Sequence, residues 1–238
     1  MVFNGDSDNQ DICSLADDYV NTDDNLFPLQ QKARFANRTM SDIWAAIFEA
    51  YGGWQFDDSN QTNLPAATTN LVNGQQQYTN PTDAVSIRGV EVKTTGGVWQ
   101  KLTPITEEEI RTWQLAEAQF YSVAAQPMRY RAMDGIIKLY PAANYSQANS
   151  LRMTFDRSMT QFVSTDTTKE PGFLANFHHG LALGMAKCFA QSKRLAELNG
   201  LLVDWQSFMK DLKEYYQARW QEKFPPRMTT VDAVREFK

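Results

Sequence analysis

The feature that most restricts the fold is a strand-turn-strand phrase in the middle of the chain. Between residues 125 and 141, two runs of strand-forming side chains flank the pair Asp134-Gly135. An Asp-Gly pair in this setting predicts a β-hairpin with a tight primed turn, because such a turn needs positive φ at its centre. Pro127 precedes the first strand, and Pro141 ends the second because proline cannot donate a hydrogen bond to a sheet.

The sequence predicts further strands on both sides of this hairpin. Residues 84–94 and 98–103 flank Gly96-Gly97, a pattern typical of a second hairpin. In residues 150–156 apolar and polar side chains alternate, which is typical of a strand with one buried face.

Two segments next to these strands are predicted to be a helix and a loop. Thr106 to Glu109 has the pattern of a capping box and predicts a helix that reaches about Ala118. Residues 54–80 are rich in Asn, Gln, Thr and Gly and predict a long connection without regular structure. Two interpretations of residues 55–80 stay open, namely disorder and contact with a partner.

Helical patterns lie towards the two ends of the chain. Apolar side chains recur every three to four residues across residues 29–51, and Gly52-Gly53 marks the end of that helix. A shorter helix is predicted over residues 13–21. Residues 1–10 are polar and acidic, and we expect them to be mobile.

The C-terminal part predicts two more helical pieces. Residues 172–198 carry one apolar stripe with small residues that permit close helix approach, and Gly200 is expected to break or bend the path. Residues 198–223 continue as a helix, which Pro225-Pro226 ends, and their apolar side chains alternate steps of four and three as in a heptad seam. The seam consists of Leu198, Leu202, Trp205, Met209, Leu212 and Tyr216. We expect its Trp205, Met209 and Tyr216 to be core or interface anchors.

The predicted fold class is α+β. Residues 12–55 and 172–223 are expected to share one core as a helical bundle, and residues 80–165 form an inserted antiparallel β-sandwich-like module. Residues 224–238 cannot build a core of their own, so they are either disordered or an arm that docks into a partner. The expected contact residues of this arm are Phe224, Arg227, Val231 and Phe237.

Composition argues against several classes of function. The formal charge of −5 disfavours a general nucleic-acid binder, which needs a basic face. No apolar run approaches the roughly 20 residues of a membrane span, and residues 1–11 are too polar for a signal peptide. The chain is therefore expected to be soluble and made in a cytoplasm. Cys13 and Cys188 are either buried thiols or a disulfide, and their spacing fits no metal site.

We find no residue pattern that predicts catalysis, a metal or a cofactor. His178-His179 is the histidine pair of the chain, and adjacent side chains point about 100° apart on a helix. A metal shared by the two is therefore disfavoured against one half-buried and one exposed histidine. Asp6-Ser7-Asp8 resembles the start of a calcium loop but lacks the glycine and glutamate that follow in such a loop, which favours a solvated acidic arm. Neither a nucleophile elbow nor a phosphate-binding glycine loop occurs.

Several phrases, in their order along the chain, resemble the head-to-tail adaptor proteins of tailed bacteriophages, including the tail tubular protein A type. The resemblance covers roughly residues 30–223. The phrases lie at Tyr78–Val90, Trp99–Pro104, Glu107–Ala118, Pro127–Tyr130, Leu139–Pro141, Leu151–Phe155 and Pro171–Leu174.

The resemblance implies a structural virion protein of the phage neck and not an enzyme. Such a protein is synthesised in the host cytoplasm and forms a ring, dodecameric in the family, beneath the portal protein. The ring contacts neighbouring copies of itself and joins the portal to the downstream tail or nozzle protein. DNA only passes through its lumen, and no cofactor or membrane is involved.

Two other classes remain open from the residues alone. The alternative is a carbohydrate- or receptor-binding tail accessory protein, whose β-sandwich module would present aromatic rings such as Trp99 and Trp113. The third class is a hydrolase with an unrecognised site, whose turnover would depend on His178 or His179.

Overall fold

A computed structural model of the chain describes residues 1–5, 10–53, 65–106, 108–109, 124–159 and 161–223. Its contacts divide the chain into two compact units. The helical unit combines Met1–Gln61 with Met159–Lys238, and the sheet unit is Thr62–Ser158. The predicted α+β class is confirmed, since N- and C-terminal helices pack together and two four-stranded sheets are inserted between them in sequence.

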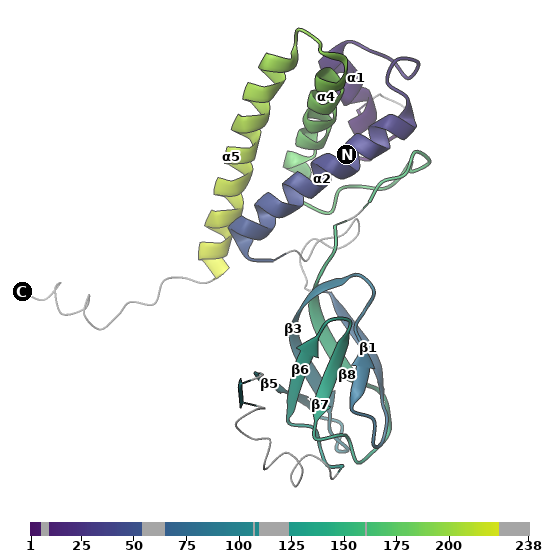
Figure 1. The fold of residues 1–238 in the computed structure, drawn as a ribbon, viewed down its shortest axis with the longest axis vertical. Coiled ribbons are helices and arrows are strands. Elements are labelled where there is room, and N and C mark those ends of the chain that lie inside the picture. Colours follow the sequence, from purple (N-terminus) through teal and green to yellow (C-terminus); the bar gives the residue numbers. More distant parts are fainter. Residues whose placement is uncertain (6–9, 54–64, 107, 110–123, 160, 224–238) are drawn as a thin grey trace, which may run out of the picture. The chain divides into compact units, whose positions relative to one another are not determined.

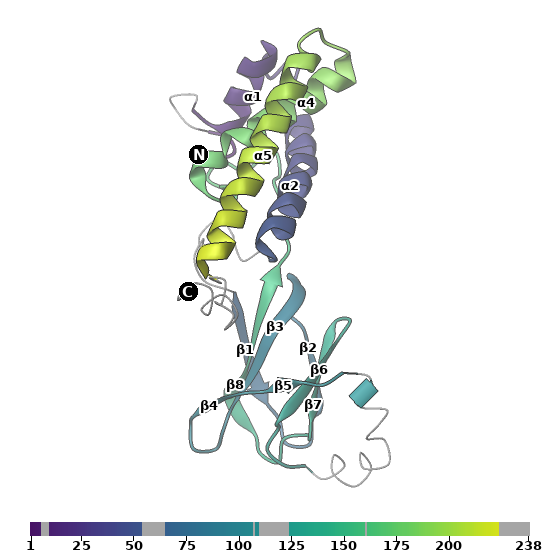
Figure 2. The same cartoon turned by 90° about the vertical axis from the view of Figure 1, so that its left-hand side faces the viewer.

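The helical unit has four α-helices and one short 3-10 helix in its described residues. They are α1 (Ile12–Val20), α2 (Leu29–Tyr51), η1 (Ala175–Phe177), α4 (His179–Lys193) and α5 (Leu198–Lys223). Helices α2, α4 and α5 contact one another, and α1 packs on α4 (Figures 1 and 2). Helix α2 ends as predicted, because Gly52 takes the left-handed conformation with φ of 75° and donates its N–H to the Phe48 carbonyl.

The break between α4 and α5 does not lie where the sequence predicted it. Gly200 is inside α5, where a Cβ would meet nothing within 4 Å, and the chain turns at Arg194 instead. Arg194 has φ of 57° and caps α4 by donating its N–H to the Ala190 carbonyl. A single exposed glycine costs a helix only about 1 kcal/mol, which the packing of α5 outweighs.

Two glycines set the distance between α4 and its neighbours. A Cβ on Gly184 would lie 2.1 Å from Thr39 Cγ2 of α2, and one on Gly180 would lie 2.0 Å from Phe208 Cζ of α5. Close approach at Gly184 was predicted from the small residues of this stripe, whereas the role of Gly180 was missed. Helix α4 is consequently buried on most sides and carries little amphipathic signal.

The expectation that the first ten residues are mobile is wrong for the described part. Phe3 is fully buried and stacks on Phe162, and the Phe3 N–H donates to the Lys169 carbonyl at 2.8 Å. Asp11 is also buried and caps α1, because its carboxylate accepts from the Ser14 N–H at 2.7 Å. The buried Phe3 side chain therefore anchors a segment that is otherwise polar and acidic. Residues 6–9, which hold the calcium-like phrase, lie outside the described residues.

The acidic character of the first 25 residues is explained in part by Lys32. Its side chain is 1% exposed, and its Nζ bonds Asp17 Oδ2 at 2.5 Å and Asp24 Oδ1 at 2.7 Å. Burial by itself lowers the pKa of Lys32, but the two carboxylates outweigh it and the pKa is raised. Burial raises the pKa of Asp17, and Lys32 offsets only part of that increase.

The sheet unit is a sandwich of two four-stranded sheets. One sheet has the order β1-β8-β3-β4 and the other β2-β7-β6-β5 (Figures 1 and 2). The pairings are antiparallel except for β5 with β6, which is parallel. Both sheets contribute to one core, whose members include Val90, Leu151 and Met153 from the first and Tyr78, Ile137 and Leu139 from the second. The strands are β1 (Ala66–Leu71), β2 (Gln77–Thr79), β3 (Ala84–Lys93), β4 (Trp99–Lys101), β5 (Thr103–Pro104), β6 (Arg129–Met133), β7 (Ile136–Tyr140) and β8 (Gln147–Arg157).

Strands β1 and β2 correct the prediction that residues 54–80 lack regular structure. In β1 only Leu71 is buried, and in β2 only Tyr78 is. Strand β1 pairs with β8 and β2 pairs with β7, so backbone ladders hold these segments. Because so few side chains enter the core, the alternation that marks a strand in sequence is missing.

Both predicted hairpins are present. Strands β6 and β7 pair across Asp134-Gly135, and β3 pairs with β4 across Gly96-Gly97. The turn at Asp134-Gly135 is not the primed type, because Gly135 has φ of 73° while Asp134 is not among the described residues with positive φ.

The strand predicted over residues 150–156 is confirmed as the middle of β8. The capping box is present too: Glu109 Oε2 accepts from the Thr106 N–H at 2.8 Å, and Thr106 Oγ1 accepts from the Glu109 N–H at 3.3 Å. The helix predicted to reach Ala118 lies outside the described residues.

Candidate interaction surface

Helix α5 places most of the predicted seam on the inner side of the helical unit. Leu212 and Tyr216 are fully buried, Trp205 is nearly so, and Met209 is half-buried. Leu202 is exposed, contrary to the heptad pattern. Leu201 and Phe208 are buried instead. They were missed because α5 contacts two helices, so its apolar face is wider than the two-position seam of a coiled coil.

Tyr216 is a member of the internal core. Its hydroxyl accepts a hydrogen bond from the Leu174 N–H at 3.3 Å, and its ring meets that of Tyr51 edge-on at 6.3 Å. Burial raises the pKa of this phenol to about 12. The side chain thus ties the end of α5 to α2 and to the segment before η1.

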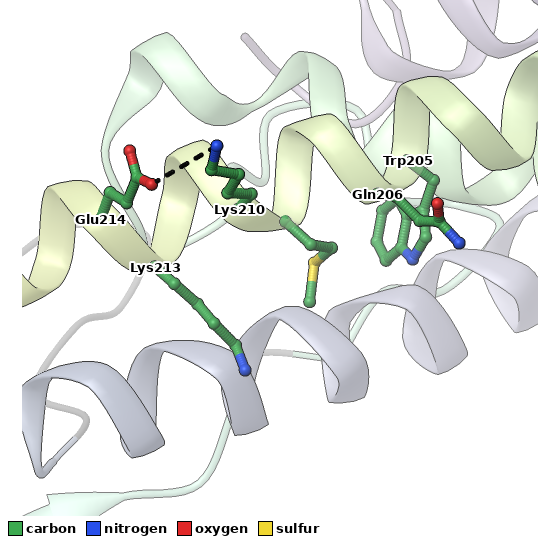
Figure 3. Close-up of a pocket in the computed structure, with 6 residues that line it drawn as sticks. Trp205, Gln206, Lys210, Lys213 and Glu214 are labelled. Carbon is green, nitrogen blue, oxygen red and sulfur yellow. Dashed lines mark ion pairs between the residues drawn. The ribbon is translucent and has the colours of Figure 1, made fainter.

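A groove of about 400 Å³, called the α2–α5 groove below, runs along α5 on the side of α2 (Figure 3). Trp205 and Met209 form its apolar floor, and polar side chains form its rim. Lys213 extends across towards α2, where its Nζ bonds Glu49 Oε2 at 2.7 Å (Figure 3). The residues that line the groove are Trp205, Gln206, Met209, Lys210, Lys213 and Glu214.

The charges at this groove are paired. Lys210 Nζ lies 3.8 Å from Glu214 Oε1, one helical turn along α5 (Figure 3). Lys187 of α4 places its Nζ 4.0 Å from the centroid of the Trp205 ring, a cation–π contact, and burial lowers the pKa of this lysine. The Lys210–Glu214 spacing is visible in the sequence, whereas Lys187 and Glu49 meet α5 only through the fold.

The four arm residues Phe224, Arg227, Val231 and Phe237 lie outside the described residues. Trp113, one of the two aromatic rings considered for sugar binding, does as well. The other, Trp99, is covered: the Arg152 guanidinium lies 4.5 Å from its ring centroid, and Arg152 Nε also donates to Glu91 Oε2 at 2.7 Å. Arg152 therefore occupies a face of the Trp99 ring on which a sugar would stack.

Both cysteines and His178 are buried in the helical unit. Both cysteines are buried free thiols, so the disulfide alternative is wrong, and burial raises the pKa of Cys13 to about 12. His178 is fully buried and bonds the Phe173 carbonyl through Nε2 at 2.8 Å, while His179 is exposed. Among the described residues, no group of three His, Cys, Asp or Glu side chains is placed to hold a metal ion. None of the described helices is both long and apolar enough to cross a membrane.

Comparison with known proteins gives one family. The model of the SU10 adaptor protein family matches residues 10–231, which cover the whole sheet unit and most of the helical unit. No curated protein matches the sequence. The match agrees with the resemblance to phage adaptors noted from the sequence, at the level of the adaptor family and not of the tail tubular protein A type.

Proposed function

The chain belongs to the SU10 adaptor protein family, and from this we propose that it forms a ring in the phage neck that joins the portal protein to the tail. An adaptor of this family is a structural phage protein of the virion and not a catalyst. The ring, the portal as its partner and a downstream tail or nozzle protein are the proposed refinements. DNA passes through the lumen of this ring without being bound.

The observation that carries the proposal is the α2–α5 groove. Its floor presents Trp205 and half-buried Met209 beside one another, and aromatic and methionine side chains are enriched at protein interfaces. Its rim charges, such as Lys213 with Glu49, already pair within the chain, so a partner can cover the floor without burying an unpaired charge.

The arm is the second proposed contact. Residues 224–238 follow α5 directly and combine the apolar Phe224, Val231 and Phe237 with the cationic Arg227. Such a segment can bind as anchors in a groove or as an added strand. The surface that binds this arm lies on the portal or on a neighbouring copy of the chain.

Assembly with purified portal tests the groove. Met209→Lys introduces a charge into the floor, and we expect it to reduce ring formation on the portal at least tenfold. Val203→Lys is the matched control, because Val203 is 65% exposed on the same helix and does not line the groove. Negative-stain microscopy counts rings, and thermal unfolding shows that both variants fold. Equal ring yield for the two variants would remove the groove from the assembly surface.

Deletion of residues 225–238 tests the arm separately. The truncated chain is expected to keep its helical unit, because every described core side chain precedes residue 225, and to lose portal attachment. Undiminished attachment would exclude a role of the arm.

A further inference from the structure

A second groove lies on another face of α5, where α1, η1 and α4 meet this helix. It measures about 300 Å³ and belongs entirely to the helical unit. Its lining combines aromatic rings with two carboxylates and contains neither lysine nor arginine. The residues are Tyr19, Phe177, His179, Leu183, Asp204, Ser207, Phe208 and Asp211.

The aromatic part of this groove is built around Phe208. The Phe177 ring meets Phe208 at a centroid distance of 6.1 Å and an angle of 68°, and the His179 ring meets it at 5.4 Å and 81°. Gly180 is what admits Phe208, since a Cβ there would overlap its ring. Phe208 itself is 5% exposed, so the rings of this groove that a ligand can reach are those of half-buried Phe177 and exposed His179.

The two carboxylates are available for a partner. Asp204 and Asp211 are exposed and seven residues apart on α5, so they lie about 10 Å apart along one side of the helix. Within the described part of the chain, neither makes an ion pair or a hydrogen bond, in contrast to the paired rim of the α2–α5 groove. Burial raises the pKa of Tyr19, and the negative charge of Asp204 adds to this increase.

Aromatic rings beside unpaired carboxylates suit one side chain in particular. A guanidinium stacks its plane on aromatic rings and donates in pairs to carboxylate oxygens, and it is more weakly hydrated than an ammonium group. The groove thus offers arginine both aromatic rings and carboxylate acceptors.

We propose that this groove binds the C-terminal segment of a neighbouring copy, with Arg227 of that copy seated between the two carboxylates, Asp204 and Asp211, and the rings of Phe177 and His179. This proposal rests on the proposed self-assembly, and it assigns one contact between neighbouring copies to this groove. Residues 224–238 carry three cations, Arg227, Arg235 and Lys238, and the apolar Met228 and Val231 lie close to the first of them.

The geometry of α5 keeps Arg227 away from Asp204 of its own chain. Arg227 comes four residues after Lys223, a backbone reach of at most about 14 Å. Returning along α5 from Lys223 to Asp204 requires about 28 Å. A contact between Arg227 and Asp204 therefore requires two copies of the chain.

A labelled peptide of residues 224–238 tests the groove with the full chain as receptor. We expect Asp204→Asn with Asp211→Asn to weaken peptide binding at least tenfold in fluorescence anisotropy. The control is Asp42→Asn with Glu197→Gln, which removes the same charge from exposed positions outside the groove and leaves binding unchanged. A peptide with Arg227→Lys should bind more weakly than the native peptide. Absence of peptide binding, or equal loss in both double variants, overturns the proposal.

Charge exchange between two full chains identifies the copy that supplies the arginine. A variant with Asp204→Lys and Asp211→Lys, and a second with Arg227→Glu and Arg235→Glu, should each fail to self-associate in sedimentation velocity. Mixing them should restore association, because each groove then meets a segment of opposite charge. A mixture no more associated than its components overturns binding in trans.

These outcomes separate this proposal from the general function. If the Asp204→Lys and Asp211→Lys variant still forms rings on the portal, the groove assignment fails and the adaptor role stands. If portal attachment is absent in the native chain while the peptide still binds, the ring proposal fails and the groove assignment stands.

Discussion

Replacement of Gly184 by alanine tests the packing on which the whole helical unit depends. Helix α4 meets both α2 and α5 at this residue. The added Cβ would lie 2.1 Å from Thr39 Cγ2, 2.8 Å from Thr39 Oγ1 and 2.9 Å from Trp205 Cζ3. Carbon atoms in contact are about 3.5–4.0 Å apart, so the helices must separate by more than 1 Å or both side chains must move.

Neither Thr39 nor Trp205 can move without disturbing other buried contacts. Thr39 is 1% exposed, and Trp205 is held between the Phe208 ring at 5.5 Å and the Lys187 ammonium at 4.0 Å. Overpacking of a tight core costs about 1–3 kcal/mol, and a clash with two buried side chains belongs at or above the upper end. The helix propensity of alanine is about 1 kcal/mol more favourable than that of glycine, which offsets part of this cost. We therefore expect a net loss of about 2 kcal/mol in the free energy of unfolding.

Urea unfolding followed by far-ultraviolet circular dichroism and tryptophan fluorescence measures this loss. Gly200→Ala is the matched control, because a Cβ at Gly200 meets nothing within 4 Å. We expect it to stabilise the chain by up to about 1 kcal/mol through helix propensity alone. The reasoning is refuted if Gly184→Ala is as stable as the native chain or as the Gly200 variant. Since Trp205 forms the floor of the α2–α5 groove, Gly184→Ala should also reduce ring yield.

Three further predictions concern buried polar groups. Lys32→Met should cost about 3–5 kcal/mol at pH 7, because Asp17 loses its cation in a largely buried place. Burial raises the pKa of Asp17, so this cost should shrink in urea titrations at pH 4, where more of the carboxyl is protonated. Thr39→Val should raise the melting temperature by a few degrees, because Thr39 Oγ1 is buried without a hydrogen-bond partner, whereas Thr39→Ser keeps the hydroxyl and should lower it. Burial lowers the pKa of His178, so the folded state binds its proton more weakly than the unfolded state. The free energy of unfolding should therefore fall as pH drops below about 6.5, and His178→Gln, whose amide can still donate to the Phe173 carbonyl, should flatten that slope.

The elements that the sequence predicts well are those whose side chains alone carry the signal. Helix α2 has a full apolar stripe and ends at Gly52, and the hairpin at Gly135 has strand formers on both sides of its turn. In each case local preference and tertiary burial agree, so one pattern suffices.

The elements that were missed owe their structure to partners distant in the sequence. Strand β1 has one buried side chain and exists because β8 supplies its backbone ladder. Phe3 is held by Phe162 and Lys169, more than 150 residues away, so the composition of its own segment is misleading. The turn at Arg194 has no glycine to mark it, and a non-glycine residue takes the left-handed conformation there.

For the candidate surfaces, the sequence indicated which residues to consider but not that they lie in grooves. Trp205, Met209 and Tyr216 form one stripe on α5 in the sequence, but the fold buries Tyr216 inside the unit and leaves Met209 at a groove. The sequence contains Asp204 and Asp211 at helical spacing, yet nothing in it reveals that the aromatic rings of other elements meet them. Grooves between helices arise from packing, which periodicity along one helix does not describe.

Salt concentration should distinguish the two grooves of α5. The α2–α5 groove would bind by covering Trp205 and Met209, and its rim charges are internally paired, so no net charge is neutralised on binding. The groove at Asp204 and Asp211 would bind by pairing exposed carboxylates with arginine, an interaction that ions screen within about 3 Å at 1 M salt and about 10 Å at 0.1 M. Raising sodium chloride from 0.05 to 0.5 M should therefore weaken the peptide of residues 224–238 several-fold. Contacts that depend on Met209 should persist under the same conditions. If both interactions responded equally to salt, the division of α5 into an apolar and an electrostatic surface would be wrong.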